Sequence, residues 1–416
     1  MRLLHKTVAG LILFSMVSGG SGIRVEAKPA DTLKAAFVRD GDLWFKKGDA
    51  ERQMTKGEHI RYPKWSFDGE WVAYSQGKEG EELRLLHVPT GRNRVVAHVK
   101  GLRNYQWAPG RNELAYQDGQ KLLWMRADKP DAPAEAAQGI GNFSWLPDGN
   151  GFIASTQAEL LPSGSWTPVD IVEIPLKGTP AAKTTKRLFE LPKMSEDFFA
   201  VDTSGFKYSR SGRWIAFIAN PTASLSADSN TLCLLSADGS LFRKVDQMLN
   251  DERWFQWADR TDRLAYIGGI GREATSNKRL MVLDAPEGKP VSFTPKGYVD
   301  QGFTWEGEPH IIVSRAKEQT GSKPKPFSPQ AQLVEIKLQG ARYKPITQPP
   351  VRYGDSGPQY FPRAGQLAWV RSGNEKADVL VSGRGGKHPS VWIKDIDPVD
   401  GFYGRWDWNA VLDIDS

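Results

Sequence analysis

The chain has 416 residues, of which 55 are lysine or arginine and 49 are aspartate or glutamate, so its formal net charge is +6. This small excess is spread along the sequence rather than gathered in blocks, which argues against nucleic-acid binding. Glycine (41) and proline (27) are plentiful, 15 tryptophans, 18 phenylalanines and 11 tyrosines supply large packing side chains, and no long amphipathic helix pattern is visible, so we predict an all-β chain.

Residues 1–27 have the pattern of a cleavable signal peptide. Arg2 and Lys6 form a basic start, and residues 7–17 are an apolar stretch. That stretch is too short to span a bilayer, which needs about 20 residues. Val25-Glu26-Ala27 fits the small-residue cleavage rule, so we predict cleavage after Ala27, and no nearby cysteine could carry a lipid. We expect an exported protein without a membrane span, not a lipoprotein, that is extracellular, in the cell wall or periplasmic.

Three short β-strands are predicted directly after this segment. They are Leu33–Arg39, Asp42–Phe45 and Glu51–Thr55, each rich in apolar or β-forming residues and separated by turn residues. They correspond to the second, third and fourth strands of the unit that follows. The first unit therefore lacks a first strand of its own.

The next stretch, residues 61–74, is a pattern that the chain repeats. An aromatic anchor, Trp65, is followed by a polar turn with Asp-Gly and then by a short apolar strand, in which Ala73 lies eight residues after the anchor. This pattern predicts two antiparallel strands joined by a tight hairpin. Runs at residues 83–88 and 94–99 add two more strands. One unit is therefore a four-stranded antiparallel sheet.

Copies of this unit recur through the rest of the chain. The anchors and the small residues that follow them are Trp65 and Ala73, Trp107 and Ala115, Trp145 and Ala154 (one residue longer), Tyr208 and Ala216, Trp257 and Ala265, Trp305 and Val313, and Tyr360 and Ala368. Successive anchors are 38 to 63 residues apart, a spacing typical of radial β arrays. A lone sheet of this size cannot bury both faces, so we predict that the copies stack around a ring.

The end of the chain is predicted to complete the first unit. The residues Tyr403–Leu412 have the pattern of the missing first strand. We therefore predict that residues 28–416 form a single, monomeric β-propeller domain of eight four-stranded antiparallel blades, closed by N- and C-terminal strands that share one blade. Seven blades is the alternative if the copy at Trp305 or the tail forms no sheet of its own.

Two motifs resemble a known family. The residues Pro63–Tyr74 resemble the WD-like repeat of TolB-type β-propellers, and Gly41-Asp42-Leu43-Trp44 is similar to a second motif of that family. The resemblance covers the propeller only, without the N-terminal α/β domain of TolB. It implies that the loops between second and third strands share one face with the segments between blades. It also implies a role as an accessory subunit of a membrane machine.

Four predicted connections between second and third strands are long. They are residues 156–166, 220–230, 268–277 and 316–330. Long loops on a rigid frame are common recognition elements, so we predict that they bind a protein partner or a polar ligand. Insertions without a function are the alternative.

Polar residues in the segments between blades are predicted to surround the channel mouth. The candidate ligand-binding residues are His59, Arg61, Arg103, Asn104, Asn142, Glu196, Asp197, Arg253, Asp300 and Gln301. Several converging polar groups can hold a polar ligand or an ion. A solvated lining is the alternative, because any propeller channel needs polar residues at its mouth.

Catalytic motifs of other folds are not expected to act here. Gly354-Asp355-Ser356-Gly357-Pro358 is similar to the serine context of trypsin-like proteases, but that chemistry needs a histidine base and an orienting carboxylate. We predict a turn at this position. The sequence has no Gly-x-Ser-x-Gly elbow, and we expect no hydrolase domain. The single cysteine, Cys233, lies in an apolar strand pattern and is predicted to be a buried free thiol.

The one candidate metal site is an aspartate cluster near the end of the chain. Asp395, Asp397 and Asp400 precede Gly401 and could provide oxygen ligands for calcium. Their spacing is one residue too long for an EF-hand loop and no bidentate glutamate follows, so a solvated turn is the alternative. We do not expect the histidines of the mature chain to converge on a metal, and no cofactor is predicted.

These features together predict an exported, non-catalytic β-propeller that serves as a protein- or ligand-binding scaffold. The alternative is a propeller-type polysaccharide lyase or glycan hydrolase with a polar site at the channel mouth. An enzyme would place an acid or base pair and a cation within about 6 Å of one another, where neighbouring charges shift each other's pKa. A scaffold would not.

Overall fold

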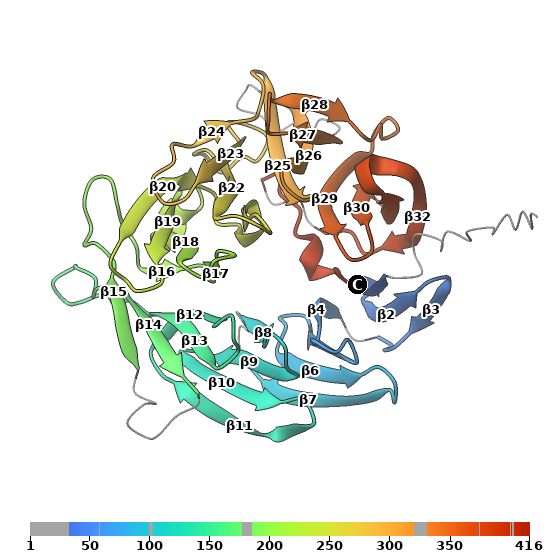
Figure 1. Cartoon of the computed structure of the whole chain (residues 1–416). Coiled ribbons are helices and arrows are strands. Elements are labelled where there is room, and N and C mark those ends of the chain that lie inside the picture. Colours follow the sequence, from blue (N-terminus) through green and yellow to red (C-terminus); the bar gives the residue numbers. More distant parts are fainter. Residues whose placement is uncertain are drawn as a thin grey trace, which may run out of the picture.

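The computed structural model describes residues 33–57, 59–99, 102, 104–176, 185–319, 331–373, 375–399, 401 and 403–416. Within these residues the chain forms eight antiparallel β-sheets arranged as a ring around a central channel (Figure 1). This confirms the predicted all-β propeller with eight blades. The predicted signal peptide, residues 1–27, lies outside the described residues. No helix in the described ranges has the length and hydropathy needed to cross a membrane.

The first four blades take up the first half of the chain. Blade 1 consists of β1 (Lys34–Arg39), β2 (Asp42–Lys47), β3 (Ala50–Gln53) and, from the far end of the chain, β33 (Leu412–Asp415). Blade 2 consists of β4 (Ile60–Trp65), β5 (Trp71–Gln76), β6 (Glu82–His87) and β7 (Arg92–His98). Blade 3 consists of β8 (Tyr105–Trp107), β9 (Glu113–Asp118), β10 (Lys121–Arg126) and β11 (Lys129–Ala137). Blade 4 consists of β12 (Ile140–Trp145), β13 (Gly151–Thr156), β14 (Asp170–Pro175) and β15 (Lys186–Glu190).

The other four blades follow in chain order. Blade 5 consists of β16 (Asp202–Thr203) and β17 (Lys207–Tyr208), which both pair with β18 (Trp214–Asn220), then α1 (Ala223–Ser226), β19 (Asn230–Ser236) and β20 (Phe242–Met248). Blade 6 consists of η3 (Glu252–Trp254), β21 (Phe255–Trp257), β22 (Arg263–Gly268), β23 (Arg279–Asp284) and β24 (Val291–Ser292). Blade 7 consists of β25 (Tyr298–Trp305), β26 (His310–Lys317), β27 (Gln332–Lys337) and β28 (Arg342–Pro345). Blade 8 consists of β29 (Gly354–Phe361), β30 (Gln366–Ser372), β31 (Ala377–Gly383), η4 (Arg384–Gly386) and β32 (Lys387–Ile396), and η5 (Trp408–Ala410) precedes β33.

The two ends of the described chain meet in blade 1. β33 pairs antiparallel with β1, with Lys34 opposite Asp415 and Phe37 opposite Leu412. The prediction of a blade shared by both termini is therefore confirmed. The predicted position of its first strand, Tyr403–Leu412, is wrong, because residues 403–411 first cross the channel mouth and only the last residues of the chain pair with β1.

The hydrophobic core lies between neighbouring blades rather than within any one of them. Leu85 of blade 2, for example, belongs to the same buried cluster as Leu114 and Tyr116 of blade 3. The cluster around Phe37 contains residues of blades 8, 1 and 2. Each blade therefore buries its faces only when both neighbours are present, which is why the repeat needs a closed ring.

Residue pairing explains the repeated anchor and alanine. In five blades the alanine lies directly opposite the polar residue that precedes the anchor; the pairs are Lys64 and Ala73, Gln106 and Ala115, Lys207 and Ala216, Gln256 and Ala265, and Gln359 and Ala368. Residues that lie opposite each other share a face of the sheet. The small alanine therefore leaves room beside a polar side chain that reaches toward the next blade.

Four of these five polar residues, all but Gln359, bond the innermost strand of one blade to that of the next. Lys64 donates to the Tyr105 carbonyl at 2.8 Å, and the Gln106 side chain donates to the Phe143 carbonyl at 3.0 Å. The equivalent bonds at the other joints from blade 1 through blade 8 are Trp65 N to Asp413 (2.7 Å), Phe206 N to Ser144 (2.8 Å), Lys207 to the Phe255 carbonyl (2.9 Å), Gln256 to the Phe303 carbonyl (2.9 Å) and Tyr360 N to Thr304 (3.2 Å). Several anchor indoles return the bond, as Trp107 does to the Lys64 carbonyl at 2.9 Å. We call this set the inter-blade bonds.

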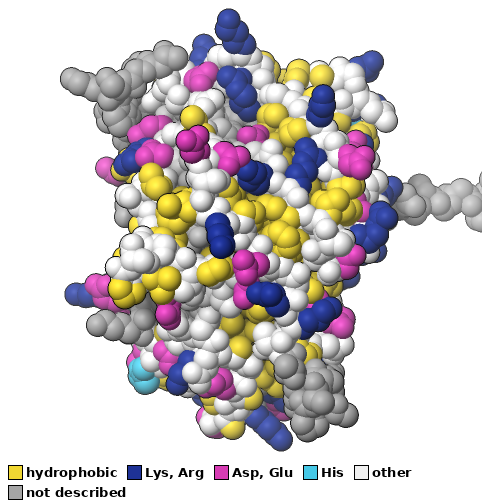
Figure 2. Space-filling model, turned by 90° about the vertical axis from the view of Figure 1, so that its left-hand side faces the viewer, with side chains coloured by type: hydrophobic (Ala, Val, Ile, Leu, Met, Phe, Trp, Pro, Cys, Tyr) yellow, Lys and Arg dark blue, Asp and Glu magenta, His cyan; other side chains and the backbone are white. Residues whose placement is uncertain are grey.

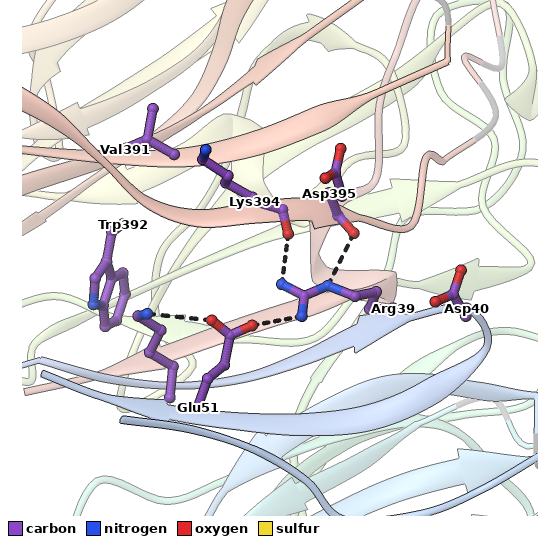
Figure 3. Close-up of a pocket in the computed structure, with 8 residues that line it drawn as sticks. Arg39, Asp40, Glu51, Val391, Trp392, Lys394 and Asp395 are labelled. Atoms are coloured by element: carbon purple, nitrogen blue, oxygen red, sulfur yellow. Dashed lines mark hydrogen bonds and ion pairs between the residues drawn. The ribbon is translucent and has the colours of Figure 1, made fainter. Parts of the chain in front are cut away.

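The joint between blades 8 and 1 is made differently. Arg39 donates to the carbonyls of Lys394 (2.6 Å) and Asp395 (3.3 Å) on β32 and pairs with Glu51 at 2.5 Å (Figure 3). Asp397 accepts the backbone N–H groups of the β1–β2 turn at 2.7 and 3.0 Å. The hollow drawn in Figure 3 is therefore lined by charges that join two blades.

Removing one inter-blade side chain should weaken the ring measurably. In Gln256→Ala the carbonyls of Phe303 and Arg253, which accept from Gln256 at 2.9 and 3.3 Å, lose their donor. We expect the free energy of unfolding in urea to fall by about 1–2 kcal/mol. The control Gln138→Ala, at an exposed glutamine bonded to Glu135, should change it by less than about 0.5 kcal/mol. Equal effects of the two substitutions would contradict a role for this bond.

Candidate ligand-binding site at the channel mouth

A basin of about 830 Å³ opens at one end of the channel. Its walls come from the segments that enter β4, β8, β12 and β21, from the β5–β6 loop, and from residues 405–409. The basin shows that loops between second and third strands and segments between blades lie on one face, as the family resemblance implies. We call this the mouth face, and the opposite side, which carries the turns between first and second strands, the hairpin face.

Residues 403–411, which we call the closing strap, form one wall of the basin. The strap leaves blade 8 and reaches across to blade 6, where Ala274 donates its N–H to the Tyr403 carbonyl at 2.8 Å. It then turns back through the channel, and Val411 accepts the N–H of Val38 at 2.8 Å. The strap therefore connects the outermost strand of blade 8 to the innermost strand of blade 1 by way of the far wall.

Arg253 holds the strap in place from the start of blade 6. Its guanidinium donates to the Trp406 carbonyl at 3.0 Å and to the Asp407 carboxylate at 2.8 Å, and it makes a bidentate pair with Asp251 at 2.9 and 2.6 Å. Burial opposes the charge of Arg253, but the Asp251 and Asp407 carboxylates outweigh this effect and raise the pKa of Arg253. Arg253 therefore stays charged and links the segment that enters blade 6 to the strap.

Tyr62 projects into the basin from the start of β4. It has a positive φ of 54°, which a non-glycine residue rarely adopts, and its side chain is half-exposed. Its carbonyl accepts the hydroxyl of Tyr105. Burial, the charge of Asp407 and a hydrogen bond to Asp407 raise the pKa of Tyr62, and the nearby arginines do not offset this. The phenol therefore remains a hydrogen-bonding group at neutral pH.

Two asparagines extend the polar wall across blades 3 and 4. Asn104 donates to the Asn142 side-chain oxygen at 2.8 Å and to the Phe143 carbonyl at 3.1 Å, and Asn142 donates to the Thr203 carbonyl at 3.0 Å. The chain of carboxamides positions the two side chains rigidly. The basin thus combines fixed amides with charged side chains from opposite sides of the ring.

Below the basin the channel narrows to a cavity of about 490 Å³. The strap passes through it, and the Trp408 indole donates to Ser356 at 2.9 Å. Lys64 and Asp413 line the same wall. Burial lowers the pKa of Lys64 although neighbouring carboxylates oppose this, and burial raises the pKa of Asp413 to about 6. Both groups take part in inter-blade bonds, so their shifted pKa values reflect their burial in the frame.

The structure brings only part of the predicted mouth residues together. Arg61, Asn104, Asn142 and Arg253 line the basin, and Gln301 lines the deeper cavity with Arg253. The other predicted residues that the structure describes lie elsewhere: His59, Glu196, Asp197 and Asp300 line neither hollow, and Arg103 lies outside the described residues.

Two of these acids are bonded away from the basin. Asp300 is fully buried and makes a bidentate pair with Arg315 at 2.7 and 2.8 Å, which fixes β25 against β26. Asp197 pairs with Lys244 of β20, the outermost strand of blade 5. Neither carboxylate lines the basin, because each forms an ion pair with a neighbouring basic side chain.

Several basin residues were missed from sequence. Tyr62, Arg405, Asp407 and Asn409 line the basin, and three of them belong to the closing strap. Residues 403–412 were predicted to form a strand, so their side chains were assigned to a sheet. The residues Arg405–Asn409 alternate polar and apolar side chains as a strand does, so the local pattern favoured a strand and gave no signal of the strap.

The candidate calcium residues have protein partners in the structure. The Asp397 carboxylate caps the β1–β2 turn, and Asp395 lies 3.6 Å from Lys376. Asp400 lies outside the described residues. Calcium binding at these aspartates stays a prediction.

The predicted turn at the serine motif is wrong, because the motif lies in β29, with a bulge between Ser356 and Gln359. The motif and the cysteine both occupy structural positions. Ser356 accepts the Trp408 indole N–H, and Asp355 is fully buried against Arg371 with bonds of 2.7 and 2.9 Å. Cys233 is buried, and burial raises the pKa of its thiol, as expected for an inert side chain. These residues therefore serve packing in blades 8 and 5.

Comparison with solved structures supports the fold. A structure from a study of two prolyl endopeptidases matches with a TM-score of 0.51 and 13% identity, over 82% of this chain and 50% of the other. A puromycin hydrolase matches with a TM-score of 0.51 and 14% identity, over 83% of this chain and 55% of that one. The dihydro-heme d1 dehydrogenase NirN, solved in complex with DHE, matches with a TM-score of 0.58 and 13% identity, over 90% and 75%.

At such low identity these matches show the β-propeller fold alone. The chain spans about half the length of the first peptidase-like chains it matches. No family model matches the sequence, and no curated protein does. The TolB-type resemblance is therefore not shown by these comparisons and stays a prediction.

Asp413 should give the stability of the ring a distinct pH dependence. Burial and the charge of Asp415 raise its pKa to about 6, against the opposing effects of the Trp65 N–H and Lys64. An aspartate in the unfolded chain has a pKa of about 3.9. The native state therefore binds the proton of the Asp413 carboxyl more tightly than the unfolded state does. The contribution of protonated Asp413 to the free energy of unfolding is fully present below about pH 4 and is lost as the pH rises through about 6.

Asp413→Asn removes this titration. We expect the difference in unfolding free energy to move in favour of the variant as the pH is raised from about 4 to about 7, measured by urea titrations at several pH values. Asp131→Asn, at a highly exposed carboxylate, is the control and should show a constant difference. A difference for Asp413→Asn that does not change over this range would contradict the assigned burial.

Proposed function

We propose that the chain is an exported, non-catalytic, monomeric propeller that works in the cell envelope or outside the cell and binds a protein partner on its mouth face. A polar segment of the partner enters the basin, while apolar side chains of the long loops contact the partner around it. The observation that carries this proposal is the combination of a polar basin and an apolar rim on one face.

The basin is suited to a short polar segment. Its volume of about 830 Å³ lies within the range of pockets that hold ligands of moderate size. Arg61, Tyr62 and Lys78 offer donors, whereas Glu79 and Glu252 offer acceptors. Positively charged donors and negatively charged acceptors line the same basin. A peptide segment with mixed side chains therefore complements it better than a uniformly charged polymer does.

The apolar rim lies on the long loops of blades 4, 5 and 6. Leu160, Leu225 and Ile270 belong to three successive connections between second and third strands, and each is more than half exposed. Met194, in the segment between blades 4 and 5, is also exposed. Exposed apolar side chains that gather on one face favour a protein contact over a small ligand alone.

The charge distribution argues against a polyanion as the partner. Figure 2 shows basic and acidic side chains interspersed with hydrophobic ones over the side of the ring that carries blades 4 and 5. A nucleic-acid surface needs a continuous basic stripe. The mixed surface therefore supports a protein partner.

The charged groups in the basin are used for structure rather than poised for proton transfer. Arg253, Asp251 and Asp407 do converge, as an enzyme would require. The guanidinium N–H groups of Arg253, however, donate to these two carboxylates and to the Trp406 carbonyl of the strap. The pKa of Tyr62 is raised, so its phenol stays protonated at neutral pH and cannot serve as a general base. This supports the non-catalytic proposal.

The export proposal rests on the N-terminal sequence. Residues 7–17 are apolar and follow two basic residues, and a small-residue site precedes residue 28. The chain has a single, buried cysteine, so its stability comes from packing and the inter-blade bonds rather than from disulfides.

Rim substitutions should separate partner binding from folding. In the triple variant Leu160→Ser, Leu225→Ser, Ile270→Ser the frame is untouched because these side chains are exposed. We expect it to lose at least about tenfold in affinity for a protein that the wild type captures from envelope extracts, measured with the purified partner by surface plasmon resonance. The matched control carries Phe67→Ser and Leu241→Ser, two exposed apolar residues on the hairpin face, and should bind like the wild type.

Two outcomes would count against the proposal. Equal binding by the rim variant and the control would show that the mouth face does not hold the partner. Release of unsaturated products from uronic-acid polysaccharides by the wild type, but not by Tyr62→Phe, would show a lyase instead of a binding protein.

A further inference from the structure

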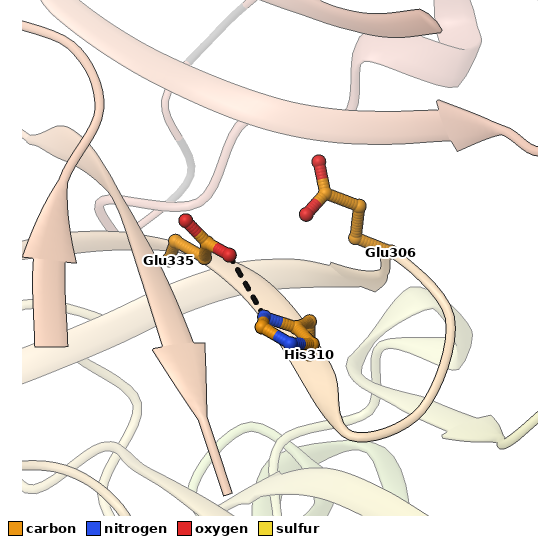
Figure 4. A group of neighbouring side chains, drawn as sticks. All are labelled: Glu306, His310 and Glu335. Atoms are coloured by element: carbon orange, nitrogen blue, oxygen red, sulfur yellow. Dashed lines mark hydrogen bonds and ion pairs between the residues drawn. The ribbon is translucent and has the colours of Figure 1, made fainter. Parts of the chain in front are cut away.

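A histidine and two glutamates meet at the edge of blade 7. Glu306 directly follows β25, His310 begins β26, and Glu335 lies in β27 (Figure 4). One nitrogen of His310 and one oxygen from each glutamate all lie within 4.8 Å of one another. The His310 ring nitrogen Nδ1 is 2.8 Å from the Glu335 carboxylate.

Glu306 is an unusually buried carboxylate in this group. Its exposed fraction is 2%, and its Oε1 accepts the N–H of Gly385 at 2.7 Å. One of its carboxylate oxygens and one of Glu335 lie within 4.8 Å of each other. Two carboxylates at this distance repel each other unless a cation lies between them.

The cations of the protein itself compensate these charges only loosely. Arg384 lies 3.7 Å from Glu306 Oε2 and is 61% exposed, and Lys344 lies 4.0 Å from Glu335 and is 67% exposed. Both distances exceed that of a hydrogen bond. Because both side chains are mostly in solvent, each can move away from its glutamate at little cost.

The donor set determines which ion would fit. One imidazole nitrogen and two carboxylate oxygens suit Zn²⁺, Mn²⁺ or Fe²⁺, whereas Ca²⁺ requires six to eight oxygens. Tetrahedral Zn²⁺ holds its ligands roughly 3.3 Å apart, given bonds of about 2.0–2.1 Å. The donor atoms, which lie within 4.8 Å of one another, therefore need to approach by up to about 1.5 Å, which rotation of the glutamate side chains can provide.

The group also lies where two blades meet. Glu335 is paired with Ile312 across the sheet, and the Ile312 face packs on Trp369 and Leu380 of blade 8. Gly385, which caps Glu306, belongs to η4 of blade 8. An ion bound by blade 7 would therefore be enclosed by blade 8.

We propose that Glu306, His310 and Glu335 form a binding site for one divalent transition-metal ion at the joint between blades 7 and 8. The three side chains supply three ligands, and a water molecule takes the open position. The ion neutralises the two carboxylates and holds the hairpin of blade 7 against η4. This site is separate from the basin on the mouth face, since it lies on the hairpin face.

The test uses the full chain, stripped with a chelator and titrated with Zn²⁺ by isothermal calorimetry. We expect about one ion per chain, and a loss of at least about tenfold in affinity in Glu306→Gln and in His310→Ala. The control is His98→Ala, which removes a histidine paired with Glu82 at 3.5 Å, and it should bind like the wild type. Zn²⁺ should also raise the melting temperature of the wild type and of the control, but not of the two ligand variants.

Arg384→Gln keeps the test decisive if a ligand variant fails to fold. It removes the guanidinium beside Glu306 and leaves the three ligands in place, so Zn²⁺ affinity should rise by a few-fold. The proposal is overturned if the wild type binds no Zn²⁺, if both ligand variants bind as the wild type does, or if Arg384→Gln leaves the affinity unchanged or lowers it.

Discussion

The pairing of β33 with β1 is the constraint on which the rest of the structure depends. β33 takes the innermost position of blade 1, whereas the strand before it, β32, is the outermost strand of blade 8. The chain must therefore travel inward before it can close the ring. It does so through the closing strap, residues 403–411. Tyr403 bonds to Ala274 of blade 6 on the far side of the ring, and the strap then returns through the channel to blade 1. The segment that closes the ring thus also forms one wall of the basin, so the same residues serve ring closure and the candidate site.

The inter-blade bonds explain why a polar residue precedes each aromatic anchor. In five blades this residue faces an alanine. Six of these polar residues bond to the backbone of the next blade: Lys64, Gln106, Ser144, Lys207, Gln256 and Thr304. Lys64 and Lys207 reach a carbonyl and lie over the aromatic ring of the next blade, at 4.5 and 4.3 Å from its centroid. Burial lowers the pKa of both lysines. These lysines at the channel wall therefore hold neighbouring blades together. The side chains that could contact a partner lie nearer the mouth.

The sequence predicted what depends on local pattern and missed what depends on long-range contact. Anchor spacing and strand alternation gave eight blades and their shared closure, because each hairpin folds from residues close in sequence. The path of the strap was not predictable, since Arg253 and Asp407 are 154 residues apart. Four predicted mouth residues reached the basin, but Asp300 did not, because Arg315 binds it inside blade 7. The group of Glu306, His310 and Glu335 was likewise invisible, since the sheet register alone brings His310 beside Glu335.

Hydrogen exchange of the two chain ends tests this account most directly. Backbone amides of β33 and of its partner residues in β1 should exchange as slowly as those of β5, a central strand of blade 2, because both lie in complete four-stranded blades. Exchange is measured by mass spectrometry on the full chain under native conditions. If residues 412–415 exchange as fast as an exposed turn while β5 stays protected, the ring is not closed by the C-terminal strand and the origin assigned to the basin is wrong.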